Sequence, residues 1–419
     1  MTMASTVRRA WQEKTFYGLL FMLPVAGISV RHWLSGSFLV LALWSLGYLR
    51  RPRESLTREE RVFLAICAFY FTVFVVTALI NGWTDQQTRF LGREIRFLFI
   101  IPIYLMLRRY PDAGVWLLRG GIIGALVILA NSLYDVLILG KPFAEGAYSQ
   151  LLLGPFAALL VIWLLTAWQL EHDRFFRRLI PFSAVAAFVS VALSGARGAY
   201  LGLLGLASIW LAMNLRGRRL ALGALAAVAI TLAAVAILPT VAQRAGIAIA
   251  EFNANMRTDD PATLEGRFNA APGHLGSVSA RLQMWRAAWL MFKDHPVWGV
   301  GRGNYEKAVV KYVERGLVHP DVAQNSHPHN AFLGTMASKG TVGLLAILAL
   351  LLYPLAVFVR TFKRSPQTAM LGITHISGFA IFSLFESAPF NKGNFITIFL
   401  IFLATFFAWH VQRSTQRGP

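Results

Sequence analysis

The sequence predicts an all-α membrane protein, a polytopic bundle of about twelve transmembrane helices with one large helical loop outside the membrane. Three observations support this fold class. The 419-residue chain is 56% hydrophobic and only 14% charged, with a mean hydropathy of +0.54, whereas soluble globular chains carry about a quarter charged residues. Apolar runs long enough to cross a bilayer recur along the chain. Basic residues gather in the short connections between these runs.

Each expected span is an apolar run close to the roughly 20 residues that cross a hydrocarbon core. The runs are 15–31, 33–49, 62–80, 95–108, 114–139, 148–169, 179–195, 199–215, 220–239, 341–360, 368–388 and 394–411. The first run follows Arg8, Arg9 and Lys14, as in a signal peptide. No small-residue cleavage site follows it at the right place, so we interpret it as an uncleaved first span.

The distribution of Lys and Arg predicts the orientation of the bundle. With twelve spans, every basic cluster in a short connection falls on the same side as the N-terminus. These clusters are Arg50, Arg51, Arg53, Arg58 and Arg61; Arg108 and Arg109; Arg174, Arg177 and Arg178; Arg216, Arg218 and Arg219; Arg360, Lys363 and Arg364; and Arg413 and Arg417. Both termini are therefore expected to be cytoplasmic. This bias also explains much of the net charge of +20, so the charge is no sign of a nucleic-acid partner.

One connection is much longer than the others, and it divides the chain into three expected parts. Residues 1–239 would form transmembrane helices one to nine, residues 240–330 a periplasmic loop domain, and residues 331–419 the last three helices. The loop is itself basic. Long loops are translocated regardless of charge, so this charge does not contradict the orientation. It requires a separate, functional explanation.

Two helices are expected in the second half of the loop. The first, 279–294, is amphipathic, with Ser279 as its N-cap and Pro296 just beyond its end. The second runs over 304–314 and stops at Gly316.

Two common kinds of site are not expected. Cys67 is the only cysteine, so no intrachain disulfide or CxxC site can form. Gly299, Gly301 and Gly303 are spaced like part of a nucleotide-binding loop, but no buried strand precedes them. We therefore predict a turn between two helices there.

Arg197 is the first candidate site residue. It lies among small residues in a tight outer turn between the seventh and eighth expected spans. An arginine at the membrane edge is costly unless it extends to the interface or has an anionic partner, and this segment alone leaves both explanations open. The neighbouring Gly195 and Gly198 favour an anion site slightly, because they allow close approach of a bulky ligand.

Arg281 and Trp285 are candidates in the first loop helix. Arg281 is expected in its first turn, where free backbone N–H groups and the positive helix end suit a phosphate. Trp285 lies one turn further on the same face. An alternative for Trp285, Trp289 and Phe292 is a stripe that is simply buried or rests on the membrane.

His327, His329 and Asn330 lie just before the tenth expected span. A His-x-His pair can be half of a metal site, but no third ligand is evident at a helpful spacing, so no metal is expected. A neutral histidine is otherwise a good general base near neutral pH. A capping or core role is the alternative for His327. It is less plausible for His329, which begins a helix directed into the bilayer.

Three of these segments together, in this order, resemble signatures of the O-antigen ligase and polymerase superfamily. His329-Asn330, nine residues and then Gly340-Thr341-Val342-Gly343 resemble its His-Asn-x9-Gly-x-x-Gly signature; Ser279 to Trp285, through Pro296 and Gly299-Val300-Gly301, is similar to its conserved loop; and Leu193 to Gly198 looks like its upstream arginine motif. Ala196 stands where that motif often has Ser, a position that is not expected to carry chemistry.

The resemblance is closest to the lipopolysaccharide O-antigen ligases, and it implies a membrane glycosyltransferase bundle of the GT-C kind. Such enzymes transfer a glycan from undecaprenyl pyrophosphate to the lipid A-core oligosaccharide, at the periplasmic face of the bacterial inner membrane, without a metal or other cofactor. It implies His329 as the catalytic base and Arg197 and Arg281 as pyrophosphate-binding residues. The supporting residues that we expect are Trp285, Asn330 and His327.

Simple chemistry agrees with these roles. Fixed guanidinium groups stabilise the charge that develops on a pyrophosphate leaving group, and an imidazole base takes the proton of an acceptor hydroxyl. Direct displacement would invert the anomeric centre. The alternatives are an O-antigen polymerase or a protein O-oligosaccharyltransferase of the same superfamily. A lipid or glycan transporter is a more distant alternative, since Asp135 and Glu386 are the main acids in or near spans and no matching halves are evident.

Overall fold

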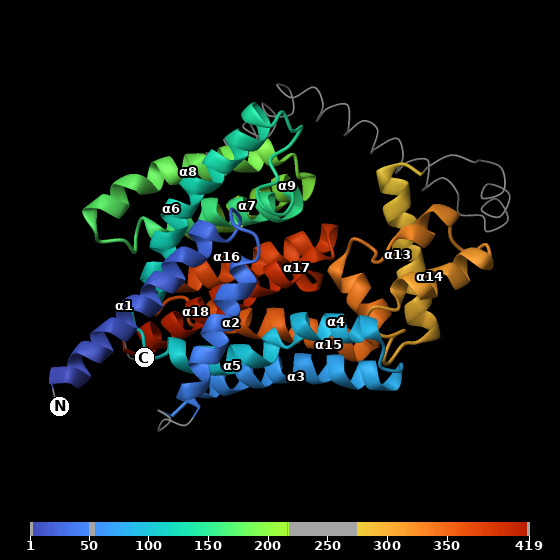
Figure 1. The fold of residues 1–419 in the computed structure, drawn as a ribbon, viewed down its shortest axis with the longest axis horizontal. Coiled ribbons are helices and arrows are strands. Elements are labelled where there is room, and N and C mark those ends of the chain that lie inside the picture. The colour runs from blue at the N-terminus through green and yellow to red at the C-terminus, as the bar shows by residue number, and fades with distance from the viewer. Residues whose placement is uncertain (1–2, 50–54, 216, 218–274, 417–419) are drawn as a thin grey trace.

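The computed structural model describes residues 3–49, 55–215, 217 and 275–416, and the regular elements among them are all helical. Expected span 220–239 and the first part of the expected loop lie outside the described residues. In chain order (Figure 1) the elements are α1 (Met3–Ala26), α2 (Trp33–Ser45), η1 (Leu46–Tyr48), α3 (Arg58–Ile80), α4 (Asp85–Glu94), α5 (Arg96–Leu107), α6 (Ala113–Leu133), η2 (Tyr134–Ile138), α7 (Gln150–Ala167), α8 (Arg174–Ser194), α9 (Arg197–Asn214), α13 (Ser277–Asp294), α14 (Tyr305–Glu314), η3 (Pro320–Gln324), α15 (Ala331–Arg360), α16 (Pro366–Phe385), α17 (Ala388–Asn391) and α18 (Gly393–Gln416).

The prediction of an all-α, multi-pass membrane protein is confirmed. Each of the eleven expected spans that fall within the described residues coincides with a helix. Seven helices in this part of the chain are long and apolar enough to cross a membrane: Arg58–Ile80, Ala113–Ile138, Gln150–Ala167, Arg174–Ser194, Ala331–Arg360, Pro366–Phe385 and Gly393–Thr415. The full count of twelve crossings stays a prediction.

The long helices run side by side, and α18 lies in their centre. The apolar window of α18 is 94% buried, and α18 packs on α2, α5, α6 and α16. Its rings Phe402 and Phe406 meet Trp163 of α7, with the Trp163 and Phe402 centroids 4.9 Å apart. A helix that is apolar all round is expected at such an enclosed position.

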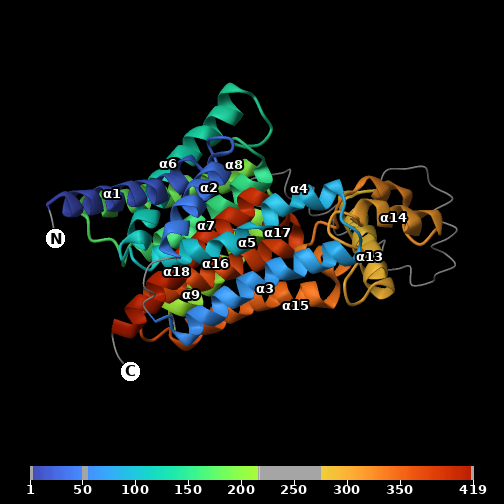
Figure 2. The same ribbon diagram turned by 60° about the horizontal axis from the view of Figure 1, so that its bottom comes forward.

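The beginning of α1 and the end of α18 lie at one end of the bundle, and α13 and α14 lie at the other (Figures 1 and 2). Two chain ends on one side are what an even number of crossings produces. That this side is cytoplasmic remains a prediction from the basic connections.

The helices at the far end have a hydrophobic core of their own. Met284 and Met291 of α13 are buried there against Tyr305 and Val309 of α14, together with Val322 of η3. This separate core supports the expected loop domain over 240–330, whose boundaries stay a prediction. The expected ends of its two helices at His295 and Gly316 are confirmed.

A main-chain joint connects this outer layer to the bundle. Helix α15 is broken at Gly340, which has φ 64° and ψ −158°. Val300 N–H donates to the Ala337 carbonyl (2.9 Å), and Thr341 N–H donates to the Pro296 carbonyl (2.8 Å). The segment 296–301 therefore supplies hydrogen-bond partners that an unbroken helix would find within itself.

The joint explains two of the glycine motifs. A Cβ atom on Gly340 would strike the Val297 carbonyl, and one on Gly299 would lie 2.5 Å from the main chain of Ser338 and Lys339. Gly299 also has a positive φ of 66°. The predicted turn at 299–303 is thus observed, and it faces the broken helix. The two glycine motifs of the sequence are the two sides of one contact.

Candidate active site

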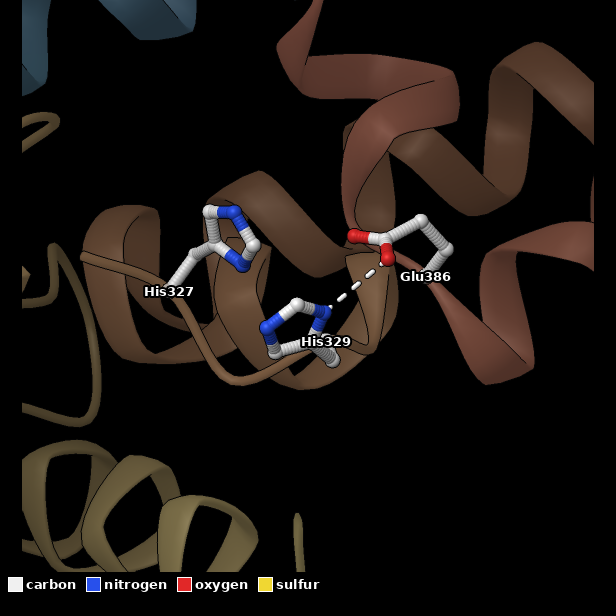
Figure 3. Close-up of side chains that lie close together, drawn as sticks. All are labelled: His327, His329 and Glu386. Carbon is white, nitrogen blue, oxygen red and sulfur yellow. Dashed lines mark hydrogen bonds and ion pairs between the residues drawn. The ribbon is translucent and has the colours of Figure 1, made fainter. Parts of the chain in front are cut away.

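The centre of the candidate site is a hydrogen bond between His329 and Glu386. His329 lies in the loop that enters α15, and Glu386 directly follows α16. The Nδ1 atom of His329 is 2.9 Å from Oε2 of Glu386, and Figure 3 shows the His329 ring between His327 and Glu386. The Glu386 side chain is only 13% exposed, and that of His329 is 29% exposed.

The state of Glu386 determines which nitrogen of His329 is free. Burial raises the pKa of Glu386, but the hydrogen bond and charge of His329 outweigh this effect, so the pKa lies below its ordinary value. The carboxylate is therefore ionised near neutral pH and can only accept hydrogen bonds. Its other oxygen, Oε1, accepts from Ser387 N–H at 2.8 Å. Since this carboxylate can only accept, Nδ1 of His329 is the donor of the hydrogen bond, and in a ring with one proton Nε2 is then an acceptor.

Asn330 fixes His329 from the helix side. Its side-chain oxygen accepts from the N–H groups of Phe332 and Leu333, both at 3.0 Å, and so caps α15. Its side-chain nitrogen donates to the Leu384 carbonyl at 3.1 Å. Asn330 thus links the start of α15 to the end of α16. Its role in the structure is to position the neighbouring histidine.

Trp285 fixes the same loop from α13. Its indole N–H donates to the Pro328 carbonyl at 2.9 Å, across 43 residues of sequence. The indole is not a passive member of an apolar stripe, whereas Trp289 is 49% exposed. His329 itself has a φ of 49°, which is uncommon for a residue other than glycine and costs conformational energy. Contacts on both sides maintain this conformation.

Arg281 and Arg197 approach this dyad from two further elements. Arg281 is half-buried in α13, and Arg197 is exposed at the first position of α9. Burial lowers the pKa of Arg281, the charge of Glu386 raises it and that of Arg197 lowers it further. Arg281 is therefore close enough to both Glu386 and Arg197 for their charges to act on it. Within the described residues neither arginine forms an ion pair.

Two details of the sequence interpretation are wrong. Helix α13 begins at Ser277 with Gly276 as its N-cap, so Ser279 is not the cap and Arg281 lies in the second turn. The free N–H groups of the first turn are thus further from Arg281 than expected. Gly195 ends α8 with a φ of 62°, and a Cβ atom on it would strike the Phe143 ring. The turn and its packing account for this glycine without a ligand.

His327 flanks the dyad in a different environment. Its ring packs edge-on to His329 with centroids 4.5 Å apart. Burial, followed by the charge of His329, lowers the pKa of His327 to about 4. Its Nδ1 atom is buried and has no hydrogen-bond partner among the described residues. His327 is therefore neutral at physiological pH.

A third potential metal ligand is present after all. Possible ligand atoms of His327, His329 and Glu386 lie within 4.8 Å of one another. No sequence spacing suggested Glu386, because it follows His329 by 57 residues. The 2.9 Å hydrogen bond already uses Nδ1 of His329 and one Glu386 oxygen, and both would have to reorient to hold an ion. Our expectation of a metal-free site therefore remains open to test.

The four elements that carry Arg197, Arg281, His329 and Glu386 meet at the end of the bundle where α13 lies. Three of these side chains were predicted from the sequence, and Glu386 was noted only as an acid near a span. Its one usable signal was an acidic residue just beyond an apolar run at the outer membrane edge, which is costly without a partner.

Comparisons with known proteins agree with this arrangement. Residues 182–348 match the sequence profile of a family described as O-antigen ligase. The chain is also 25% identical over 368 residues to a protein of Haemophilus influenzae named only as uncharacterized, an alignment that covers 82% of this chain and 85% of the relative. The profile match spans Arg197, Arg281 and His329. Over residues 182–348 the chain is therefore similar to the O-antigen ligase family.

Proposed function

We propose that this protein is an O-antigen ligase, a membrane glycosyltransferase that transfers O-antigen polysaccharide from undecaprenyl pyrophosphate to the lipid A-core oligosaccharide. The reaction takes place at the periplasmic face of the bacterial inner membrane. The observation that carries the proposal is the ionised Glu386 bound to Nδ1 of His329, with Arg281 and Arg197 beside it. A base next to two cations without carboxylate partners suits the transfer of a group from a pyrophosphate to a hydroxyl.

The two arginines act on the donor. No nucleotide is available outside the cytoplasmic membrane, so the donor arrives already activated on its lipid. When the glycosyl–phosphate bond breaks, the electron pair stays on the phosphate oxygen. Arg197 and Arg281 stabilise this negative charge with guanidinium groups that can each bind two phosphate oxygens. Their mutual repulsion in the free enzyme is relieved when the pyrophosphate binds.

His329 acts on the acceptor. The Nε2 atom accepts the proton of a core-sugar hydroxyl while the hydroxyl oxygen bonds to the anomeric carbon. The imidazolium that forms is stabilised by Glu386, which keeps its own negative charge. Attack opposite the leaving pyrophosphate inverts the anomeric configuration. NMR of the glycan linkage in donor and product checks this, and a retained configuration would contradict direct displacement.

A ligation assay with purified protein, lipid-linked glycan and lipid A-core tests the function. Wild type should give a lipopolysaccharide-sized ladder. Arg197→Ala, Arg281→Ala and His329→Ala should remain folded and lose at least about 10²-fold in rate. Lys293→Ala is the matched control, because Lys293 is an exposed cation on the same helix as Arg281.

The same assay separates the alternatives within the superfamily. A longer lipid-linked glycan, formed without use of the lipid A-core, would identify a polymerase instead. Glycan attached to a protein acceptor would identify a protein O-oligosaccharyltransferase. Export of glycan with no new covalent bond would indicate a transporter.

A further inference from the structure

A second group of cations lies at the end of α17 (Ala388–Asn391). Arg93 ends α4 next to Glu94, and Arg96 begins α5. Arg93 donates to the Asn391 carbonyl at 3.1 Å, and the Arg96 guanidinium packs against Gly393. Lys392, between these two contact points, is exposed. We call Arg93, Arg96 and Lys392 the α17 cation cluster.

No carboxylate neutralises this cluster among the described residues. The nearest acid, Glu94, is fully buried and already pairs with Arg302 (3.1 Å) and Lys339 (3.2 Å). Arg93 is also close enough to feel the charge of Glu94, so this carboxylate is shared among three cations. Burial and the charge of Arg302 lower the pKa of Arg93, although Glu94 acts in the opposite direction. Arg93 and Arg96 are half-buried and have no anionic partner of their own in the described part of the chain, which is costly at a membrane edge and points to an anionic ligand.

The guanidinium groups are held in place by contacts that do not neutralise them. Arg93 lies over the Phe90 ring at 4.7 Å, and Arg302 lies over the same ring at 4.8 Å. Arg96 donates to the Ser35 hydroxyl at 3.0 Å. Cation–π contacts and neutral acceptors orient an arginine while leaving its charge available. The cluster is therefore preorganised, which reduces the entropic cost of binding.

The cluster lies beside the catalytic loop. The charge of Lys392 acts on His327, whose ring packs on His329. A cavity of about 40 Å³ is lined by His327 of this loop, by Asn391 of α17, and by Arg302 and Phe90. A ligand held by the cluster is thus close to the loop that carries His329.

We infer that the α17 cation cluster binds a phosphate group of the lipid acceptor. The inference rests on the proposed function, since it assigns the two anionic substrates to two separate groups of cations. The donor pyrophosphate binds Arg197 and Arg281, and a phosphate on the acceptor headgroup binds Arg93, Arg96 and Lys392. This phosphate is only bound and takes no part in the reaction. It sets the distance between the anchored headgroup and the hydroxyl that reaches His329.

The test compares phosphorylated lipid A-core with the same acceptor after enzymatic dephosphorylation. Full-length protein in nanodiscs is assayed as wild type, Lys392→Gln and Arg93→Gln/Arg96→Gln. Lys392 is exposed and its substitution leaves the α17 contacts in place, so this variant separates binding from folding. Lys311→Gln on α14 makes the same charge change at an exposed position of the outer layer and is the control.

We expect Lys392→Gln to raise the KM for the phosphorylated acceptor about tenfold, the size of one charge-assisted hydrogen bond. The KM for the donor and the KM for dephosphorylated acceptor should not change. Inorganic phosphate should compete with the phosphorylated acceptor in wild type and not in the double variant if free phosphate also fits the site. If the lipid alone fits, phosphate should not compete in either protein.

Native mass spectrometry of the protein with each acceptor measures binding independently of transfer. Equal binding of the phosphorylated acceptor by wild type, Lys392→Gln and the double variant overturns the inference. An effect of these variants on donor KM alone overturns it as well. Failure of wild type to transfer glycan would refute the proposed function, while the binding result would still decide whether the cluster recognises phosphate.

Discussion

Nδ1 of His329 and Oε2 of Glu386 lie 2.9 Å apart although 57 residues separate them in the chain. The hydrogen bond joins the loop before α15 to the residue that follows α16. It selects the ring tautomer in which Nε2 is free, and it places a negative charge where the imidazolium will form. A histidine base with its own carboxylate is a common catalytic arrangement.

Replacing Glu386 by Gln should lower kcat for transfer by about 10²-fold or more. The amide can present its N–H groups to His329, which favours the wrong tautomer, and it cannot stabilise the imidazolium. The KM values for donor and acceptor should change little. Glu306→Gln, at an exposed glutamate of α14, is the matched control. A variant with unchanged kcat would show that His329 does not depend on Glu386.

Replacing Arg281 by Lys should raise the KM for the donor and lower kcat, with an effect of at least about tenfold on kcat/KM. Lysine keeps the charge but loses the planar fork that binds two phosphate oxygens. Steady-state rates at varied donor concentration measure the effect. Full activity of Arg281→Lys would reduce the role of this side chain to a general positive charge.

Replacing Trp285 by Phe should lower kcat about fivefold, the value of one neutral hydrogen bond, and leave both KM values unchanged. The ring volume is largely kept, but the donor to the Pro328 carbonyl is lost, so the loop holds His329 less firmly. Trp289→Phe on the exposed side of α13 should have no effect. An equal loss in both variants would instead indicate that α13 is destabilised.

Replacing His327 by Phe should reduce the sensitivity of the fold to acid. Unfolded histidine takes up its proton near its ordinary pKa of 6.5, whereas the pKa of folded His327 is about 4. Between these values only the unfolded state binds the proton, so the folded state loses stability as the pH falls through this window. The loss reaches at most about 3 kcal/mol below pH 4.

Thermal unfolding of detergent-solubilised protein between pH 7 and pH 4.5 measures this effect. The midpoint should fall less steeply in the His327→Phe variant than in wild type. Parallel curves for the two proteins would exclude His327 as a source of the acid sensitivity.

Replacing Gly340 by Ala should lower the free energy of unfolding by about 1–3 kcal/mol from backbone strain alone. The steric contact of the new Cβ atom should add to this loss. The backbone angles of Gly340 are essentially restricted to glycine, and a Cβ atom would also strike the Val297 carbonyl. The melting temperature is the readout. Gly36→Ala, in the helix α2 with open space around it, is the control and should be neutral or slightly stabilising. Equal melting temperatures for wild type and Gly340→Ala would show that the contact between segment 296–301 and the break in α15 accommodates a Cβ atom.

The sequence predicted the long elements well because the membrane imposes a length and a composition on each span. It missed α4 (Asp85–Glu94), which is short and polar and gives no hydropathy signal. The signal that was present is the capping box in which Thr84 and Gln87 pair at the start of this helix. The break of α15 at Gly340 was also missed, because a glycine inside an apolar run is as easily a packing residue.

For the site, residue chemistry and a family resemblance predicted Arg197, Arg281 and His329 as candidates but not the carboxylate partner of His329. Glu386 lies outside the matched segment 182–348 and has no local spacing to any of them. Its identification required the packing of α15 on α16, a tertiary contact that no sequence period encodes. Trp285 and Asn330 were found as residues, yet only hydrogen-bond partners 43 and 54 residues away define what they do.

The joint at Gly340 constrains how the protein is made. Several main-chain groups of 296–301 find their partners on the two sides of the break in α15, and Glu386 follows one further helix along the chain. These hydrogen bonds can form only after both halves of α15 are present in the chain. A chain that stops before residue 386 contains Arg197, Arg281 and His329 but lacks the carboxylate that pairs with His329. The His329–Glu386 hydrogen bond is thus available only once all of α16 has been synthesised.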